Sequence, residues 1–101
     1  MKLIVAATAA LALAATPAHA ALSGFYDSAE QITTIFDSSA IADAVRQAPI
    51  GAISNTGKRD DGTNEWTIRV QECDLVVYLL PVPPNGPGKT TYEVDVPGTC
   101  D

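Results

Sequence analysis

Two cysteines and a proline-rich run constrain how the second half of this chain can fold. Cys73 and Cys100 lie on either side of the segment 81–88, in which four of the eight residues are proline and lack a backbone N–H. If the cysteines face each other across an antiparallel pair, the numbers of facing residues sum to 173 and the turn falls between Gly86 and Pro87. The cysteine spacing and the turn residues therefore predict the same hairpin independently. We expect the proline-rich run to be its connection, because it cannot continue the ladder.

The apolar pattern extends this hairpin into a sheet with one buried face. An apolar residue at every second position over 66–70 is typical of a half-buried strand, and a tight connection over 71–74 leads to the apolar segment 75–80. Pairing Val70 with Leu75 keeps the apolar side chains on one face. The register of the second hairpin places Leu75 opposite Gly98, Val77 opposite Val96 and Leu79 opposite Val94. The predicted inner face consists of Trp66, Ile68, Val70, Leu75, Val77, Leu79, Tyr92, Val94 and Val96.

The region before the sheet is predicted to be helical. After a flexible lead-in over 21–27, residues 28–48 are interpreted as two short helices or one bent helix that Pro49 ends. Asp37-Ser38-Ser39 favours a helix start, because each side chain can accept from exposed backbone N–H groups. Residues 28–36 also have the composition of a strand, so both alternatives stay open for them. The side chains expected to cover the inner face are Ile32, Ile35, Phe36, Ile41 and Val45.

These patterns predict an α+β fold, in which a short N-terminal helical segment packs on a three- to four-stranded antiparallel β-meander with one disulfide. A further candidate strand covers residues 50–56, and a polar connection over 57–63 follows it. In the chain-entropy model a disulfide with this loop length contributes roughly 3–4 kcal/mol. That is a large share of the total of about 5–15 kcal/mol that is usual for a domain.

The first twenty residues have the pattern of a secretory signal peptide. Lys2 is followed by the apolar run 3–16 and then by Pro17-Ala-His-Ala20, with cleavage expected after Ala20. We therefore expect residues 21–101 to form a single small secreted domain, periplasmic or extracellular, in a compartment where cysteines pair. The run is shorter than the roughly 20 apolar residues that a membrane span needs. No cysteine follows the cleavage point for lipid attachment, so no stable membrane anchor is expected after cleavage.

Cleavage would remove His19, the only histidine, and this limits the chemistry of the mature chain. Ser-His-Asp and Cys-His catalysis need an imidazole base, and zinc catalytic sites usually use histidine ligands. A paired cysteine is neither a nucleophile nor a soft-metal ligand. We therefore expect no enzyme activity, no metal and no cofactor. The oxygen-rich segment 60–65 departs from the spacing of a calcium loop and is interpreted as a solvated turn.

The mature chain is acidic. Loss of Lys2 leaves five basic and twelve acidic side chains, so the formal net charge changes from −6 to −7. Such a surface repels phosphate backbones and anionic lipid, so nucleic acid is not an expected partner. A basic protein partner would be attracted over a distance of about 8–10 Å. Negative charge also serves solubility alone, and both interpretations stay open.

The outer face of the predicted sheet is the candidate contact surface. The pairing above places an apolar stripe between charged side chains there, as in protein-contact patches. The proline-rich loop is stiff, so ordering it on binding would cost little. A plain solvent-exposed sheet face and a rigid connector are the alternatives. The candidate protein-contact residues are Arg69, Val76, Tyr78, Leu80, Pro83 and Pro84.

These observations favour a small secreted or periplasmic protein of non-catalytic type. We expect a protein-binding or accessory module of the cell envelope, with inhibition of the partner as one form of that role. Its partner would be another envelope or secreted protein. Two alternatives remain: a self-associating structural envelope protein whose sheet faces or edges pair, and a small hydrolase that uses paired carboxylates.

Overall fold

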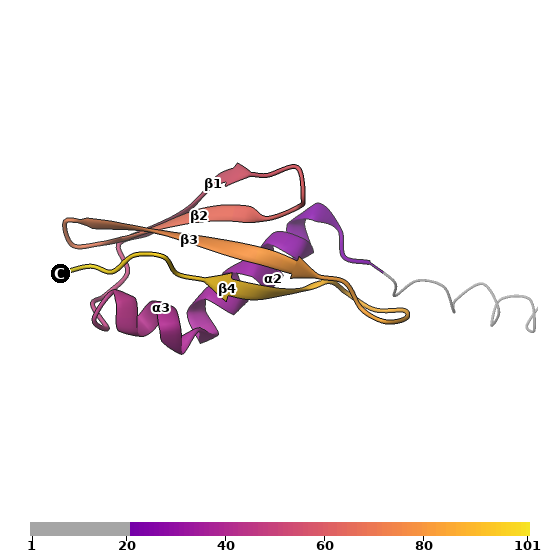
Figure 1. The fold of residues 1–101 in the computed structure, drawn as a ribbon, viewed down its shortest axis with the longest axis horizontal. Helices are drawn as coiled ribbons and strands as arrows, with labels where there is room; N and C mark the ends of the chain where they lie inside the picture. Colours follow the sequence, from indigo (N-terminus) through magenta and orange to yellow (C-terminus); the bar gives the residue numbers. More distant parts are fainter. Residues whose placement is uncertain (1–20) are drawn as a thin grey trace, which may run out of the picture.

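The computed structural model describes residues 21–101, and the predicted signal peptide over 1–20 lies outside the described residues. Within residues 21–101 two helices precede four strands, and the strands form one antiparallel sheet in the order β1-β2-β3-β4 (Figure 1). The predicted α+β fold is confirmed. In residues 21–101 no helix is long and apolar enough to cross a membrane. The elements are α2 (Gly24–Asp37), α3 (Ser39–Ala44), β1 (Ala52–Lys58), β2 (Asn64–Val70), β3 (Cys73–Val82) and β4 (Thr91–Asp95).

Serine residues cap the N-terminal ends of both helices. Ser23 caps α2 by accepting from the Tyr26 N–H at 3.4 Å, so the helix begins within the segment expected to be a flexible lead-in. That expectation is wrong from Gly24 onward, and residues 28–36 are helix rather than strand. Ser38 ends α2 and begins α3, since its N–H donates to the Ile35 carbonyl and its Oγ accepts from the Ile41 N–H. Of the two alternatives for residues 28–48, the structure has two helices rather than one bent helix.

The chain turns sharply between α3 and the sheet. Arg46 and Gln47 both have φ of 57°, and the Gln47 N–H donates to the Ala42 carbonyl at 2.8 Å, which closes the helix end. Pro49 follows this turn and does not itself end the helix, because α3 stops at Ala44. β1 then begins at residue 52 and ends at residue 58, two residues later at each end than the predicted strand.

The hairpin between β2 and β3 is tighter than predicted. Val70 pairs with Cys73 instead of Leu75, and Ile68 pairs with Leu75, so Gln71 and Glu72 alone form the turn. Gln71 has φ of 52°, as the two-residue hairpin turns that match strand twist require. The predicted register was therefore wrong by two residues. An even shift leaves every side chain on its predicted face, because the side-chain period of a strand is two.

The hairpin between β3 and β4 has the register that the cysteine spacing predicted. Leu79 lies opposite Val94, and Leu80 lies opposite Glu93. The ladder ends at Asp95, so the predicted pairs of Leu75 and Val77 lie beyond it. Contrary to expectation, the ladder continues through Pro81 and Val82, which face Tyr92 and Thr91. Proline fits there because β2 pairs only as far as Leu79, so Pro81 has a neighbouring strand on one side alone.

The core lies between the helices and the inner face of the sheet. Ile35, Ile41 and Val45 are buried against it, whereas Ile32 is partly buried and Phe36 is 57% exposed. The prediction that Phe36 covers the sheet is therefore wrong. Helix α2 is rotated so that Gln31, 4% exposed, occupies the buried row. The inner-face residues that are buried are Trp66, Ile68, Val70, Leu75, Val77 and Leu79, and those partly buried are Tyr92, Val94 and Val96.

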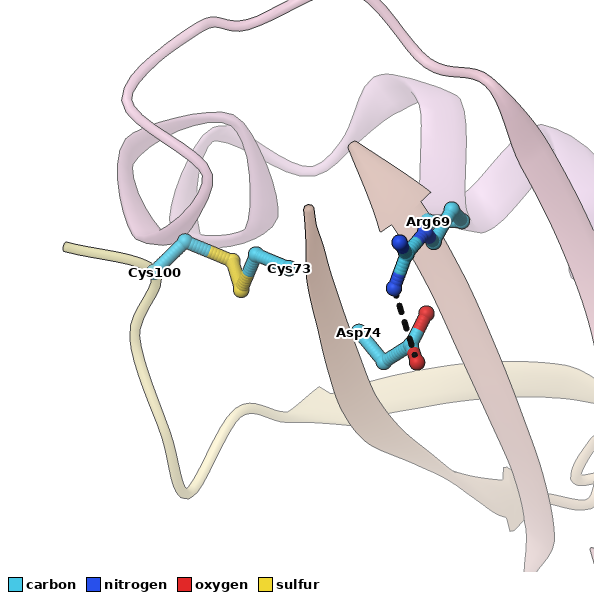
Figure 2. Close-up of a disulfide and its surroundings, with 4 residues drawn as sticks. All are labelled: Arg69, Cys73, Asp74 and Cys100. Atoms are coloured by element: carbon cyan, nitrogen blue, oxygen red, sulfur yellow. Dashed lines mark ion pairs between the residues drawn. A yellow bond between two sulfur atoms is a disulfide. The ribbon is translucent and has the colours of Figure 1, made fainter. Parts of the chain in front are cut away.

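The predicted disulfide joins the C-terminal segment to the sheet. Cys73 and Cys100 are bonded, with their Cα atoms 5.9 Å apart, and Figure 2 shows the bond at the start of β3. The Cys100 N–H also donates to the Ala44 carbonyl at 2.8 Å. The end of the chain therefore links the sheet to the end of α3, and the prediction of a disulfide is confirmed.

Candidate functional site

The outer face is the sheet surface opposite α2 and α3, and it carries the candidate contact residues of β2 and β3. Side chains alternate along β3, so those opposite to the buried row point outward. They form what we call the β3 stripe, consisting of Val76, Tyr78, Leu80 and Val82. Leu80 is 41% exposed and Val82 is 36% exposed, while Val76 and Tyr78 are half-buried. The structure thus brings four of the six candidates, Arg69, Val76, Tyr78 and Leu80, onto one surface.

Arg69 is engaged on this surface. Its Nη1 lies 3.1 Å from Oδ2 of Asp74, the residue opposite it across the β2–β3 pair (Figure 2). Both side chains are about half exposed, so this ion pair contributes at most about 1 kcal/mol. A partner could replace Asp74 as the acceptor at small cost.

Arg59 lies over the ring of Tyr78, and the sequence analysis missed it. The guanidinium carbon is 4.2 Å from the ring centroid, a cation–π contact. Arg59 belongs to the β1–β2 connection. This connection folds back because the Arg59 N–H donates to the Thr63 carbonyl and Gly62 has φ of 90°. No spacing in the sequence signals this contact, since Tyr78 comes next to the start of β2 only through the pairing of Glu65 with Tyr78.

The two sides of the β3 stripe differ in their polar contacts. Toward β1, the Thr56 hydroxyl donates to Glu65 Oε2 at 2.8 Å and lies 3.1 Å from the Thr67 hydroxyl. Toward β4, Glu93 and Asp95 are exposed. Neither takes part in an ion pair within the described part of the chain. The outer face therefore has uncompensated negative charge along its β4 side.

Pro83 and Pro84 lie beyond the sheet, in the exposed connection that extends the β3–β4 hairpin (Figure 1). An ion pair links the C-terminal end of the connection to α2, since Lys89 Nζ lies 2.7 Å from Glu30 Oε1. The β3 stripe leads directly into it through Val82. Face and loop are therefore continuous, although the two prolines are not part of the sheet surface.

A second apolar surface lies on the helix side of the sheet. It is a groove of about 470 Å³ near the end of α2, with Ile68 and Ile41 among its lining residues. Phe36 and Ile50 line it as well and are 57% and 48% exposed. The sequence gives no signal of this groove, because the apolar spacing of Ile32, Ile35 and Phe36 predicts that Phe36 is buried.

A cluster of polar side chains joins α2 to the sheet. The Trp66 indole N–H donates to Gln31 Oε1 at 2.8 Å, and Gln31 Nε2 donates to Asp27 Oδ2 at 3.1 Å. The Tyr92 hydroxyl donates to both Asp27 carboxylate oxygens, at 2.8 and 3.0 Å. Burial, together with the Asp27 carboxylate, raises the pKa of Tyr92 to about 12. These groups satisfy one another, so the cluster fixes the position of α2.

The oxygen-rich segment 60–65 closes its own turn. Asp61 Oδ1 accepts from the Thr63 N–H at 2.9 Å, and this hydrogen bond lowers the pKa of Asp61. Asn64 Nδ2 donates to the Gly62 carbonyl at 3.2 Å. Over residues 21–101 the structure contains no group of three or more His, Cys, Asp or Glu side chains placed to hold a metal ion.

The chain was compared with protein-family models, with curated proteins and with solved structures, and none of them matched.

Proposed function

We propose that this chain is a non-catalytic protein-binding or accessory module that acts outside the cytoplasm. It contacts another secreted or envelope protein through the outer face and the adjacent proline-rich connection. The observation that carries the proposal is the exposure of the β3 stripe, in which Leu80 and Val82 leave large apolar side chains in water. Apolar side chains at the centre of a surface with a charged rim are the usual arrangement of a protein interface.

The residue types around the stripe support this proposal. Tyrosine and arginine are enriched among the residues that dominate binding energies. The Arg59 guanidinium carbon lies 4.2 Å from the centroid of the Tyr78 ring, so each side chain restricts the movement of the other. Less side-chain freedom is then lost when a partner binds.

The disulfide supports the proposed compartment. A bond between Cys73 and Cys100 persists in oxidising compartments such as the periplasm and is rare in the cytosol. The signal peptide expected over residues 1–20 is the route by which the chain would reach that compartment. Terminal sequencing of the exported protein is the direct test, and a start at residue 21 is the expected result.

The contact surface is tested by affinity capture from an envelope extract with three baits. The baits are the oxidised mature domain, its Tyr78→Ala variant and its Phe36→Ala variant. Phe36 is the matched control, because it is an exposed aromatic residue on the groove of the helix side. We expect one protein that the parent domain captures to be absent from the Tyr78→Ala capture and present in the Phe36→Ala capture.

Two results would contradict the proposal. Identical captures with all three baits would remove Tyr78 from any contact surface. Loss with Phe36→Ala alone would move the contact to the groove. The melting temperatures of both variants should stay close to that of the parent, since truncation of a partly exposed side chain usually changes stability little.

A further inference from the structure

The two edges of the sheet are not equivalent. β1 forms one edge, and its register shifts between Asn55 and Gly57, which marks a β-bulge. Bulges and lysine residues such as Lys58 are common protection against the pairing of further strands. β4 forms the other edge and pairs with β3 without a shift from Thr91 to Asp95. It contains no proline, glycine or lysine. β4 is therefore the edge that is geometrically regular enough to accept another strand.

The inner side of β4 is incompletely covered. Tyr92 and Val94 are only partly buried, whereas Leu79, which pairs with Val94 on β3, is fully buried. Helix α2 contacts β4, so the helical layer reaches this edge. A further strand would add side chains between α2 and solvent and would bury the rest of Tyr92 and Val94. The apolar side chains of this edge are therefore only partly covered.

The outer side of β4 determines which strand can pair there. Glu93 and Asp95 are exposed, and the described residues provide no cation for either. A second copy of this chain pairing antiparallel along β4 would bring carboxylates of both copies together, and like charges opposite each other are destabilising. Lysine or arginine at alternate positions of an incoming strand would instead face both carboxylates. The net charge of −7 expected after cleavage would also attract a basic strand.

We propose that the β4 edge accepts an extended basic segment of the partner protein as a fifth strand. Apolar side chains of this segment alternate with basic ones and pack beside Tyr92 and Val94. Backbone hydrogen bonds then supply affinity, and the alternating side chains supply specificity. This inference rests on the proposed function, because it specifies the chemistry of the partner that the module binds.

The test uses the oxidised mature protein and three short capped peptides. In the first, lysine alternates with valine, and in the second, glutamate alternates with valine. The third is the lysine peptide with alternate backbone nitrogens methylated, which keeps the charge and removes the donors of one edge. We expect the lysine peptide alone to bind measurably and to slow amide hydrogen exchange over residues 91–96. Equal binding of the methylated peptide would overturn the inference, because the attraction would then be of charge alone.

Charge-matched variants test the role of the two carboxylates. Glu93→Gln with Asp95→Asn should weaken binding of the lysine peptide roughly three- to tenfold, as expected for two exposed ion pairs. Asp43→Asn with Asp60→Asn removes the same charge from exposed residues outside the sheet and should leave affinity unchanged. An equal loss in both double variants would contradict the proposed strand position.

The outcomes separate this inference from the proposed function. If the lysine peptide does not protect β4 but a partner is still lost with Tyr78→Ala, the fifth strand is refuted and the contact surface stands. If the peptide protects β4 and capture does not depend on Tyr78, the edge is supported and the outer face is refuted.

Discussion

At the scale of single residues, Gln31 determines how α2 packs on the sheet. It is 4% exposed, and its Oε1 accepts a hydrogen bond from the indole N–H of Trp66, which is itself buried. Gln31→Leu keeps most of the volume but leaves that N–H without an acceptor. We expect a loss of about 1–3 kcal/mol in the free energy of unfolding. Urea denaturation measures it, with Thr33→Ala on the exposed side of the same helix as the control.

The control should change stability by no more than about 0.5 kcal/mol. A similarly small effect of Gln31→Leu would show that another group replaces Gln31 as the acceptor for Trp66. The orientation of α2 would then have a different cause.

Tyr92 makes stability depend on pH at the alkaline end. The fold raises the pKa of its hydroxyl from 10.0 to about 12, so the folded state holds a proton that the unfolded state has lost between these values. Stability from this group is fully present below pH 10 and is lost as the pH rises toward 12. Denaturation curves measured between pH 10 and pH 12 should show that the free energy of unfolding falls in the parent and falls less in Tyr92→Phe. Identical slopes would contradict the raised pKa.

At the scale of elements, the disulfide holds the C-terminal segment against two layers. Cys100 is bonded to β3 through Cys73, and its N–H bonds to the end of α3. Replacing both cysteines by alanine should lower the free energy of unfolding by about 2–5 kcal/mol. Amide exchange at residue 100 should become faster, because the segment is then held by that backbone bond alone. An unchanged exchange rate would mean that packing, rather than the disulfide, holds the segment.

The β3–β4 hairpin could be predicted from the sequence because two independent signals agree on it. The sum of the cysteine positions and the location of the prolines give one register, which the pairing of Leu79 with Val94 confirms. The β2–β3 register had only the alternation of apolar residues to set it. Alternation is equally satisfied by pairing Val70 with Cys73 or with Leu75, so the tightness of the turn decided between them.

At the scale of the whole molecule, charge and edge structure predict a monomer. The β1 edge is bulged, the β4 edge carries Glu93 and Asp95, and the chain has a formal net charge of −6. The mass from light scattering should therefore stay at the monomer value as concentration rises at low salt. Asp43→Asn with Asp60→Asn should behave in the same way, whereas Glu93→Gln with Asp95→Asn should associate more readily. A mass that rises with concentration in the parent would favour the self-associating structural protein instead.

Sequence patterns were enough to predict the fold class, the disulfide, the serine cap between the helices and the inner row of the sheet. Each of these follows from local spacing or from the hydrogen-bonding capacity of single residues. Three features could not be predicted without the folded chain: the rotation of α2, the position of Arg59 over Tyr78 and the partly covered edge at β4. Each of these depends on contacts between residues far apart in the chain. Gln31 fits the buried row because its Oε1 accepts a hydrogen bond from the indole N–H of Trp66, 35 residues later.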